Sequence, residues 1–469
     1  MPVFDPQLLA ADCGGRWHGA PTVPVSGFSI DTRTIQGGDL FIALRTDRRD
    51  GHEFLGLASA AGASGAVVSR ELPEQRIARL QVLDTLEAFQ AMARAHRRRF
   101  AGRVAGVTGS AGKTSTKDLL AAILGEPGEV LATEGNLNNH LGVPLTLLRL
   151  DPARHACAVV EAGINAPGEM DVLGSIIQPE VALITTVAAA HLERLGSIER
   201  VGEEKARLAA HLMPGGAAVF PAACLAYPGF NYLAARSFVA VSSKEAGTRL
   251  PSGATGILYT VTNELAATAI ALEWAGVKHE FSFRRLTRGM AANAALAVIT
   301  ALHLGVGADD IRRRLVRWHP AALRGEVIEE GGRLVYLDCY NANPASMLDA
   351  LDGFLALAPP SACRLFVIGC MEELGTESAA LHRAVGAAWP MRAEDRLFIF
   401  GKQADAFAEG LQSAHAVAQV AINPERGEVE AAIAAARGAI FLKGSRAYRL
   451  ETLVQPSVSG ERHEKETAA

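Results

Sequence analysis

The stretch Val104-Ala-Gly-Val-Thr108-Gly109-Ser110-Ala111-Gly112-Lys113-Thr114 joins an apolar segment to a segment with helical spacing. Residues 104–107 predict a buried strand, and residues 114–124 predict a helix. Backbone N–H groups at the start of a helix attract phosphate, and glycines allow a phosphate to approach closely. The residues from Thr108 to Thr114 are therefore expected to bind ATP, with Lys113 at the outer phosphates and the Thr114 hydroxyl facing Mg²⁺.

The glycine spacing of this loop departs from the usual phosphate-loop pattern. That pattern places a glycine five residues before Gly112, where this chain has Val107, and Gly106 and Gly109 lie on either side. For the loop alone, a structural turn with a stray lysine is the alternative. The strand before the loop and the helix after it favour nucleotide binding.

Length and composition predict about three domains with substantial cores. The chain has 469 residues, of which 49% are apolar and 20% charged. Its formal net charge of −4 argues against nucleic acid or an anionic membrane as the main partner. Six scattered cysteines without a C-x-x-C pair are typical of reduced thiols in a cytoplasmic protein. We recognise neither a signal peptide nor an apolar run of the ~20 residues that a membrane span needs.

The order of strands and helices predicts an α/β fold of three domains. Residues 1–84 are expected to form a small α/β domain, and residues 85–315 a central domain with a phosphate-loop-type parallel sheet. Residues 316–469 are expected to form a C-terminal domain with a Rossmann-like sheet, because apolar strands and helices alternate again. The expected strands are 28–33, 39–44, 65–69, 104–107, 158–161, 181–187, 333–338, 365–369, 396–401 and 439–442.

Two further segments carry expectations of their own. Residues 221–285 are rich in Ala, Gly, Ser and Thr, and predict loops and irregular strands. Asp84 is expected to cap a helix that ends in Arg97-Arg98-Arg99. Because basic side chains suit a helix C-terminus, we expect this run to be the solvated end of a helix rather than a nucleic-acid patch.

Polar blocks follow the phosphate loop along the chain. Three asparagines in Thr133-Glu-Gly135-Asn136-Leu-Asn138-Asn139 are costly to bury unless hydrogen-bonded, which favours a polar cleft. Glu161 ends an apolar strand, where a carboxylate is well placed to bind Mg²⁺. Later blocks are Ala188-Ala-Ala-His191-Leu-Glu193, Glu203-Glu204-Lys205-Ala206, Leu337-Asp338-Cys339-Tyr340-Asn341-Ala342-Asn343-Pro344 and Lys443-Gly444-Ser445-Arg446.

The order of these blocks resembles the Mur ligases of peptidoglycan synthesis, from Ser29 to about Leu453. Within that family it is similar to the branch that adds D-alanyl-D-alanine to UDP-N-acetylmuramoyl-tripeptide. The resemblance implies an ATP- and Mg²⁺-dependent ligase that forms a carbon–nitrogen bond, and a monomer. It also implies that Lys113, Glu161, His191 and Lys205 are catalytic. Thr114, Glu161, His191 and Lys205 would hold the metal, with Lys205 carbamylated by CO₂.

The resemblance also assigns residues that bind the nucleotides and the peptides. Asn293, Arg324 and Asp338 would contact ATP, in addition to the loop. Ser29, Asp31, Thr32 and Arg33 lie in blocks similar to the region that binds the uridine nucleotide. The remaining expected substrate contacts are Asn136, Asn138, Asn139, Tyr340, Asn341, Asn343, Lys443, Ser445 and Arg446.

Several positions depart from the family pattern. Arg45-Thr46 replaces a Lys-Gly pair, Thr287-Arg288-Gly289 replaces a Gly-x-His, and Leu337 and Cys370 replace aspartates. These changes are compatible with ordinary divergence, which we favour, or with a changed acceptor.

Alternatives exist for single residues and for the whole chain. Lys205 could be a surface lysine paired with glutamate, Asn293 a helix cap, and Arg324 a solvated arginine. The chain could be a Mur-like ligase for another amino acid or peptide. It could also be a nucleotide-binding regulatory protein without turnover, against which Lys113, Glu161, His191 and Lys205 argue.

Overall fold

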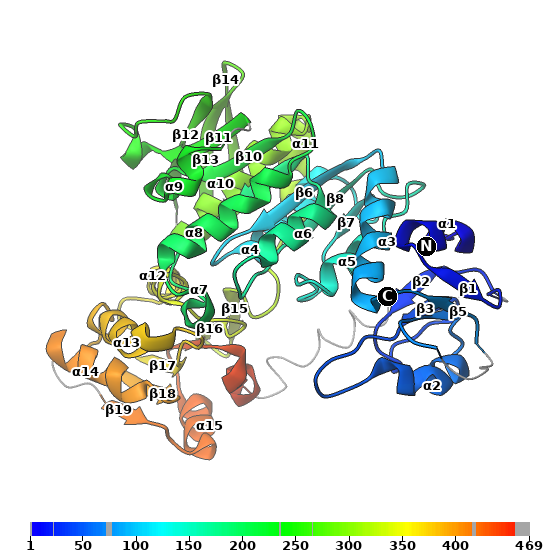
Figure 1. Cartoon of the computed structure of the whole chain (residues 1–469). Helices are drawn as coiled ribbons and strands as arrows, with labels where there is room; N and C mark the ends of the chain where they lie inside the picture. The colour runs from blue at the N-terminus through cyan, green and yellow to red at the C-terminus, as the bar shows by residue number, and fades with distance from the viewer. Residues whose placement is uncertain are drawn as a thin grey trace.

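The computed structural model describes residues 2–21, 23–71, 77–233, 236–264, 266–414 and 419–454. Its strands form three sheets in three lobes that follow one another along the chain (Figure 1). The central lobe, cyan to green, lies between the blue N-terminal lobe and the yellow-to-red C-terminal lobe. The expected α/β class and three-domain architecture are confirmed, while the boundaries at residues 84 and 315 stay predictions.

The N-terminal sheet has the order β1-β5-β4-β3-β2, parallel except for the β1–β5 pair. Alternate residues of its strands face opposite layers. Phe41 and Val68 belong to a core with Leu55 of α2, while Leu40 and Val67 belong to the core on the other face. The elements are α1 (Pro6–Cys13), β1 (Arg16–His18), β2 (Gly27–Ser29), β3 (Asp39–Ile42), α2 (Leu55–Ala60), β4 (Gly65–Val68), β5 (Arg79–Gln81) and α3 (Thr85–Arg99).

Helix α3 connects the N-terminal lobe to the central lobe. It contacts α1 on one side and α5 and α6 on the other. Asp84 caps it, as expected, by accepting hydrogen bonds from the N–H groups of Leu86 and Glu87. The expectation of a solvated basic end is wrong for Arg97, which is 2% exposed and pairs with Glu180 at 2.8 Å. Its guanidinium also reaches backbone carbonyls that no local sequence pattern reveals.

The central sheet has the order β14-β13-β12-β11-β10-β9-β6-β8-β7. Its strands are parallel from β7 to β12, and β13 and β14 add an antiparallel extension. Helices α4, α10 and α11 pack on one face, and α5 and α6 pack on the other. The strands are β6 (Arg103–Thr108), β7 (Val130–Ala132), β8 (Cys157–Glu161), β9 (Val181–Ile184), β10 (Ala217–Pro221), β11 (Arg236–Ser242), β12 (Ala254–Asn263), β13 (Ala267–Trp274) and β14 (Val277–Arg284).

The central helices are the following: α4 (Lys113–Leu124), α5 (Gly142–Leu147), α6 (Glu169–Ile177), α7 (Leu192–Leu195), α8 (Ile198–Ala206), α9 (Pro228–Asn231), α10 (Arg288–His303) and α11 (Ala308–Leu315). The expectation of irregular structure over 221–285 is wrong, because β11 to β14 are regular strands. Their buried face carries aromatic side chains such as Tyr259, Phe281 and Phe283, while their exposed positions mix small and polar residues with a few apolar ones such as Leu258.

The C-terminal sheet has the order β15-β16-β20-β17-β18-β19, with only the β15–β16 pair antiparallel among the described strands. Strand β20, the last strand in the sequence, lies between β16 and β17, so the connection from β16 to β17 crosses over it. In open α/β sheets, ligands bind beyond the carboxyl ends of the strands. The elements are β15 (Glu326–Glu330), β16 (Arg333–Asp338), α12 (Pro344–Leu357), β17 (Arg364–Gly369), α13 (Ser378–Ala387), β18 (Arg396–Phe400), α14 (Ala404–Ala414), β19 (Gln419–Ile422), α15 (Arg426–Ala435) and β20 (Ala439–Lys443).

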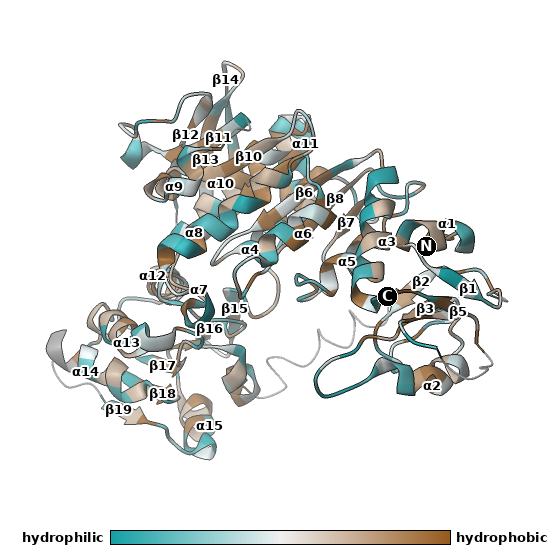
Figure 2. Ribbon diagram, viewed as in Figure 1, coloured by the Kyte–Doolittle hydropathy of each residue, from teal (hydrophilic) through white to brown (hydrophobic). Residues whose placement is uncertain are grey.

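Both faces of this sheet are apolar. Phe354 of α12 and Phe407 of α14 share a core with Phe366, whereas Val429 of α15 shares a core with Val367. Figure 2 shows brown segments in β17 and β18 and helices of mixed brown, white and teal around them. Among the described residues, we find no helix that is long and apolar enough to cross a membrane.

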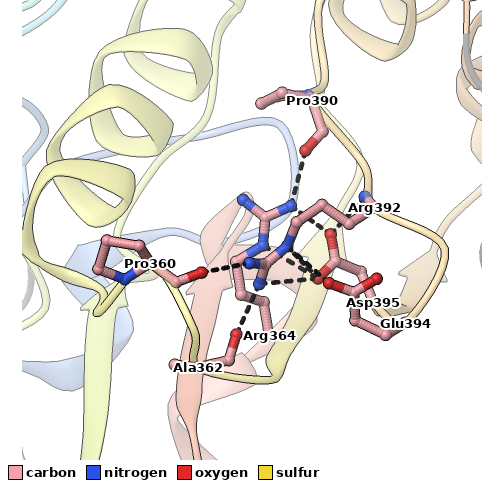
Figure 3. A network of polar contacts seen from close by, with 7 residues as sticks. All are labelled: Pro360, Ala362, Arg364, Pro390, Arg392, Glu394 and Asp395. Carbon is pink, nitrogen blue, oxygen red and sulfur yellow. Dashed lines mark hydrogen bonds and ion pairs between the residues drawn. The ribbon is translucent and has the colours of Figure 1, made fainter.

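A buried carboxylate organises the amino ends of β17 and β18, away from the carboxyl ends. Asp395 is 0% exposed, and the guanidinium groups of Arg364 and Arg392 converge on it (Figure 3). Arg364 Nε donates to Asp395 Oδ1 at 3.0 Å, and the Arg392 backbone N–H donates to Oδ2 at 2.7 Å. The same arginines donate to the carbonyls of Pro360, Ala362 and Pro390. These hydrogen bonds connect the loop before β17 to the loop before β18.

Candidate active site

The phosphate loop connects β6 to α4 and bends sharply at two glycines. Gly109 has φ 151° and Gly112 has φ 75°, which is the left-handed region that favours glycine. A Cβ atom on Gly112 would lie 2.1 Å from Asn293 Nδ2, so α10 closely approaches the loop. Lys113 Nζ donates to the Gly109 carbonyl at 3.0 Å. The pKa of Lys113 lies below its ordinary value, chiefly because the side chain is buried. The negative charge of Glu161 opposes this shift, and the positive charge of Arg324 adds to it.

Glu161 lies at the carboxyl end of β8, directly beside the loop. Thr114 Oγ1 donates to its Oε2 at 2.8 Å, and Asn138 Nδ2 donates to its Oε1 at 2.7 Å. The Glu161 backbone N–H donates to Thr133 Oγ1 at 2.9 Å. The carboxylate is 1% exposed and fixed next to a hydroxyl oxygen, an oxygen-rich arrangement that suits Mg²⁺.

Lys205 in α8 is buried at 1% exposure. Its ammonium has no hydrogen bond or ion pair to any residue that the structure describes. Burial holds the pKa of Lys205 well below its ordinary value, and nearby Lys113 lowers that pKa further. Lys205 is therefore not a surface lysine, although the negative charge of Glu204 opposes part of the lowering of its pKa.

His191 precedes α7 and lies within electrostatic reach of both lysines. The pKa of His191 lies below its ordinary value, chiefly because the ring is buried. The carboxylate of Glu373 opposes this shift, and the positive charges of Lys113 and Lys205 add to it. Its Nδ1 lies 2.5 Å from Oε2 of Glu373, which belongs to the C-terminal lobe. The central lobe thus brings Lys113, Glu161, His191 and Lys205 into one cluster.

The C-terminal lobe faces this cluster with residues at the carboxyl ends of β16 and β20 and with Arg324, which lies just before β15. The Arg324 guanidinium lies 4.0 Å from the centre of the Tyr340 ring, so Arg324 is not simply solvated. Asn343 Nδ2 donates to the Ser110 carbonyl in the phosphate loop at 3.1 Å. Lys443 Nζ lies 3.1 Å from Asp338 Oδ2 and donates to the Asn341 carbonyl at 2.9 Å.

A cleft of about 640 Å³ extends from the phosphate loop along the edge strand β7. Thr114 and Thr133 form its wall on the central lobe, and Arg324 and Tyr340 line the opposite side. Arg149, Arg154 and His155 add basic side chains to its far end. A cleft of this size, with convergent polar groups, can hold a small molecule.

Other expected site residues make local contacts. Asp31 pairs with Arg33, which lowers the pKa of the carboxyl to about 2, and Ser29 donates to the Asp31 carbonyl. Among the described contacts, none joins residues 29–33 to the phosphate loop. Thr32 is half-buried, Asn136 is exposed and Ser445 is buried. Asn139 accepts hydrogen bonds from backbone N–H groups at the start of α5. Arg446 forms an ion pair with Glu451.

The structure adds contacts that sequence reasoning missed. Glu373 pairs with His191, and its only signal in the sequence is its position three residues after Cys370, which replaces an aspartate of the family pattern. Asp349 of α12 accepts from Thr287 Oγ1 and from the Gly289 N–H, each at 2.6 Å, and no sequence signal marked it. The cap of α10 is Thr287, so the alternative of a capping role for Asn293, inside that helix, is wrong.

Family comparisons cover all three lobes of the chain. The Mur ligase middle domain matches residues 107–301, and the Mur ligase glutamate ligase domain matches residues 323–446. The Mur ligase family catalytic domain matches residues 24–97. The chain belongs to the Mur ligase family.

Individual Mur ligases are similar over most of the chain. The UDP-N-acetylmuramoyl-tripeptide--D-alanyl-D-alanine ligase of Escherichia coli is 35% identical over 402 residues, covering 84% of this chain and 85% of the relative. The ligase of the same name from Bacillus subtilis is 32% identical and covers 92% and 93%. A crystal structure of MurF from Acinetobacter baumannii superposes with a TM-score of 0.82 at 28% identity, covering 97% and 98%.

Proposed function

We propose that this protein is the ATP-dependent ligase that adds D-alanyl-D-alanine to UDP-N-acetylmuramoyl-tripeptide in peptidoglycan precursor synthesis. The observation that carries the proposal is the similarity to ligases of this name over nearly the whole chain. The cluster around Lys113 supports it, because blocks spread from Thr108 to Asn343 meet there. The substitutions at Leu337 and Cys370 are then ordinary divergence.

The reaction would proceed through an acyl phosphate. The terminal carboxylate of the tripeptide attacks the γ-phosphorus of ATP, and the bond to ADP breaks. The amine of D-alanyl-D-alanine then attacks the acyl carbonyl carbon, loses a proton, and expels inorganic phosphate. Bringing the carboxylate to the triphosphate requires positive charge, which Lys113 supplies, and Arg324 approaches from the C-terminal side.

Magnesium fits this site on the evidence of the donor atoms. Thr114 Oγ1 and both oxygens of Glu161 are fixed in one place, and Mg²⁺ there would neutralise charge developing on the phosphates. Among the described residues, no three His, Cys, Asp or Glu side chains cluster, so a second ion at His191 needs another oxygen ligand.

A carbamate on Lys205 would supply that ligand. The depressed pKa of Lys205 favours its neutral amine, the form that attacks CO₂ to give a carbamate and release a proton. The modification replaces a repulsive pair of ammonium groups, Lys205 and Lys113, with an attractive one. We therefore include carbamylated Lys205 in the proposal, beside Thr114, Glu161 and His191.

The nucleotide and peptide contacts remain those of the sequence prediction. ATP would lie against the loop, Asn293, Arg324 and Asp338, and the uridine nucleotide against residues 29–33. Six free cysteines are compatible with action in the cytoplasm. We infer a monomer from the family resemblance, and sedimentation analysis checks it.

One assay tests the proposal against its rivals. The purified protein receives ATP, Mg²⁺, UDP-N-acetylmuramoyl-tripeptide and D-alanyl-D-alanine, and phosphate release is followed together with the mass of the product. Phosphate release that requires both peptide substrates supports the proposal. Release with another amino acid or peptide instead indicates a changed acceptor, and no release with any acceptor indicates a protein without turnover.

A companion variant tests the phosphate loop itself. Lys113→Ala should abolish turnover and leave the unfolding transition in place, because the lysine is needed for charge rather than for the core. Surviving activity would contradict the role that we assign to the loop.

A further inference from the structure

A side-chain pair joins the central lobe to the C-terminal lobe beside α7. Nδ1 of His191 and Oε2 of Glu373 are 2.5 Å apart, although the residues are 182 positions apart in the sequence. Figure 1 shows α7 at the boundary between the two lobes. Glu373 lies in the loop that leaves the carboxyl end of β17.

The backbone on both sides of this pair is held in place. His191 has φ 54° and Glu373 has φ 61°, a conformation that is unfavourable for residues other than glycine and persists only where the surroundings enforce it. The Glu193 N–H donates to the Glu373 carbonyl at 3.3 Å. A Cβ on Gly375 would lie 3.1 Å from Glu193 Cα, so the two chains are in close contact.

Glu372, the residue before Glu373, makes its contact within the C-terminal lobe. Glu372 accepts a hydrogen bond from the Tyr448 hydroxyl, inside the C-terminal lobe. Of two adjacent carboxylates, one is therefore retained by its own lobe and the other reaches across. This division makes Glu372 a matched control for Glu373.

The chemistry of the pair constrains the His191 ring. An ionised carboxylate only accepts hydrogen bonds, so the proton between the two groups belongs to Nδ1. The neutral ring then has its lone pair on Nε2. Histidines that bind metals commonly donate their other N–H to a carboxylate in this way, which fixes the tautomer and the ring orientation.

We propose that Glu373 is a positioning residue, which holds His191 as the Nδ1–H tautomer with Nε2 available to a divalent cation. The inference rests on the proposed function, which places such a cation at His191. It follows that the central lobe has a correctly oriented His191 only when the C-terminal lobe supplies the carboxylate. Metal binding and lobe docking are thereby coupled through one hydrogen bond.

The first test uses the full-length protein without metal or nucleotide. Two-bond ¹H–¹⁵N correlation spectra report which ring nitrogen carries the proton, and His191→Gln identifies the signals among those of 13 histidines. We expect Nδ1–H in the wild type and in Glu372→Ala, and a mixture of tautomers in Glu373→Ala. An Nε2–H ring in the wild type would overturn the proposal, whether or not any variant folds.

The second test measures the metal requirement of the ligase. Loss of the orienting carboxylate should raise the Mg²⁺ concentration for half-maximal rate by about 10–100-fold in Glu373→Ala. Glu373→Gln keeps an acceptor and should lose less, and Glu372→Ala should match the wild type. Equal requirements in all four proteins would refute the role of Glu373. If the wild type makes no product, the proposed function fails, while the ring signals still decide this inference.

Discussion

Asp395 and Lys205 are both fully buried ionisable residues, but they differ in their partners. Asp395 accepts from two arginines and a backbone N–H group. Lys205 has no hydrogen-bonded partner among the described residues, and the positive charge of Lys113 lowers its pKa while Glu204 raises it. Burying a charge is costly unless it is paired and hydrogen-bonded. Asp395 is therefore a structural group, whereas Lys205 is expected to change its chemical state.

Asp395→Ala should lower the free energy of unfolding by roughly 3–5 kcal/mol, because it leaves the buried Arg364 unpaired. Glu394→Ala is the matched control. Glu394 is 58% exposed and lies 3.3 Å from the same Arg392, so its loss should cost at most about 1 kcal/mol. Urea unfolding measures the free energy of unfolding of both variants. Equal losses would show that the buried contacts of Asp395 with the two arginines contribute no more to stability than an exposed ion pair does.

Lys205→Ala should reduce turnover by about 10²-fold or more, because it removes the anionic ligand that we propose for the metal. Formate or acetate at high concentration should restore part of the rate by filling the space with a carboxylate. Lys117→Ala is the control, since Lys117 is also buried but donates to the Thr133 carbonyl. Rescue of both variants, or of neither, would argue against a carbamate on Lys205.

At the scale of elements, helix α12 connects the C-terminal sheet to the nucleotide site. Its cap, Asn343, accepts from the Ser346 N–H at 2.9 Å and donates to the Ser110 carbonyl at 3.1 Å. One turn further, Asp349 accepts from the start of α10. The first half of α12 is thus hydrogen-bonded both to the phosphate loop and to the helix that carries Asn293.

The two roles of Asn343 can be separated. Asp caps helices as well as Asn does, so Asn343→Asp should keep the helix cap, whereas Asn343→Ala should lower the free energy of unfolding by about 1 kcal/mol more than Asn343→Asp does. Both variants lose the donor to Ser110, a hydrogen bond worth about 0.5–1.5 kcal/mol, or roughly 2- to 12-fold in the KM for ATP. An unchanged KM in Asn343→Asp would mean that this contact does not serve the nucleotide.

The predictable elements were those with strong local signals. The apolar strands of β6, β8 and β16 and the Asp84 cap of α3 follow from side-chain type and spacing alone. Strands β12 to β14 could not be recognised, because one of their faces is exposed and small residues obscure the alternation. Arg97 was misjudged because its partners, such as Glu180, come from a distant part of the chain.

The candidate site shows the same limit. Thr114, Glu161 and Lys113 were predictable from their places at strand and helix ends, and most other site residues depended on the family resemblance. The contacts of Glu373 and Asp349 join residues about 60 to 180 positions apart, and no spacing rule reaches across lobes. A carboxylate that supports a site from another lobe looks like any exposed glutamate in the sequence.

At the scale of the whole molecule, the lobes are joined unequally. The N-terminal lobe is tied to the central lobe through α3 and the buried Arg97–Glu180 pair. The described hydrogen bonds between the C-terminal lobe and the central lobe are individual contacts at Ser110, His191, Glu193, Thr287 and Gly289. A ligand at the phosphate loop should therefore affect the C-terminal lobe more than the N-terminal one.

Hydrogen exchange measured by mass spectrometry tests this asymmetry with one substrate at a time. ADP with Mg²⁺ should slow exchange in peptides that cover residues 108–114 and 338–346 together, because Asn343 bonds to the loop. UDP-N-acetylmuramoyl-tripeptide alone should slow exchange around residues 29–33, where we expect the uridine nucleotide. Asn343→Asp should uncouple the first pair of segments, leaving protection by ADP at the loop but not at residues 338–346. Protection of residues 29–33 by ADP alone would contradict the assignment of the two nucleotides to separate lobes.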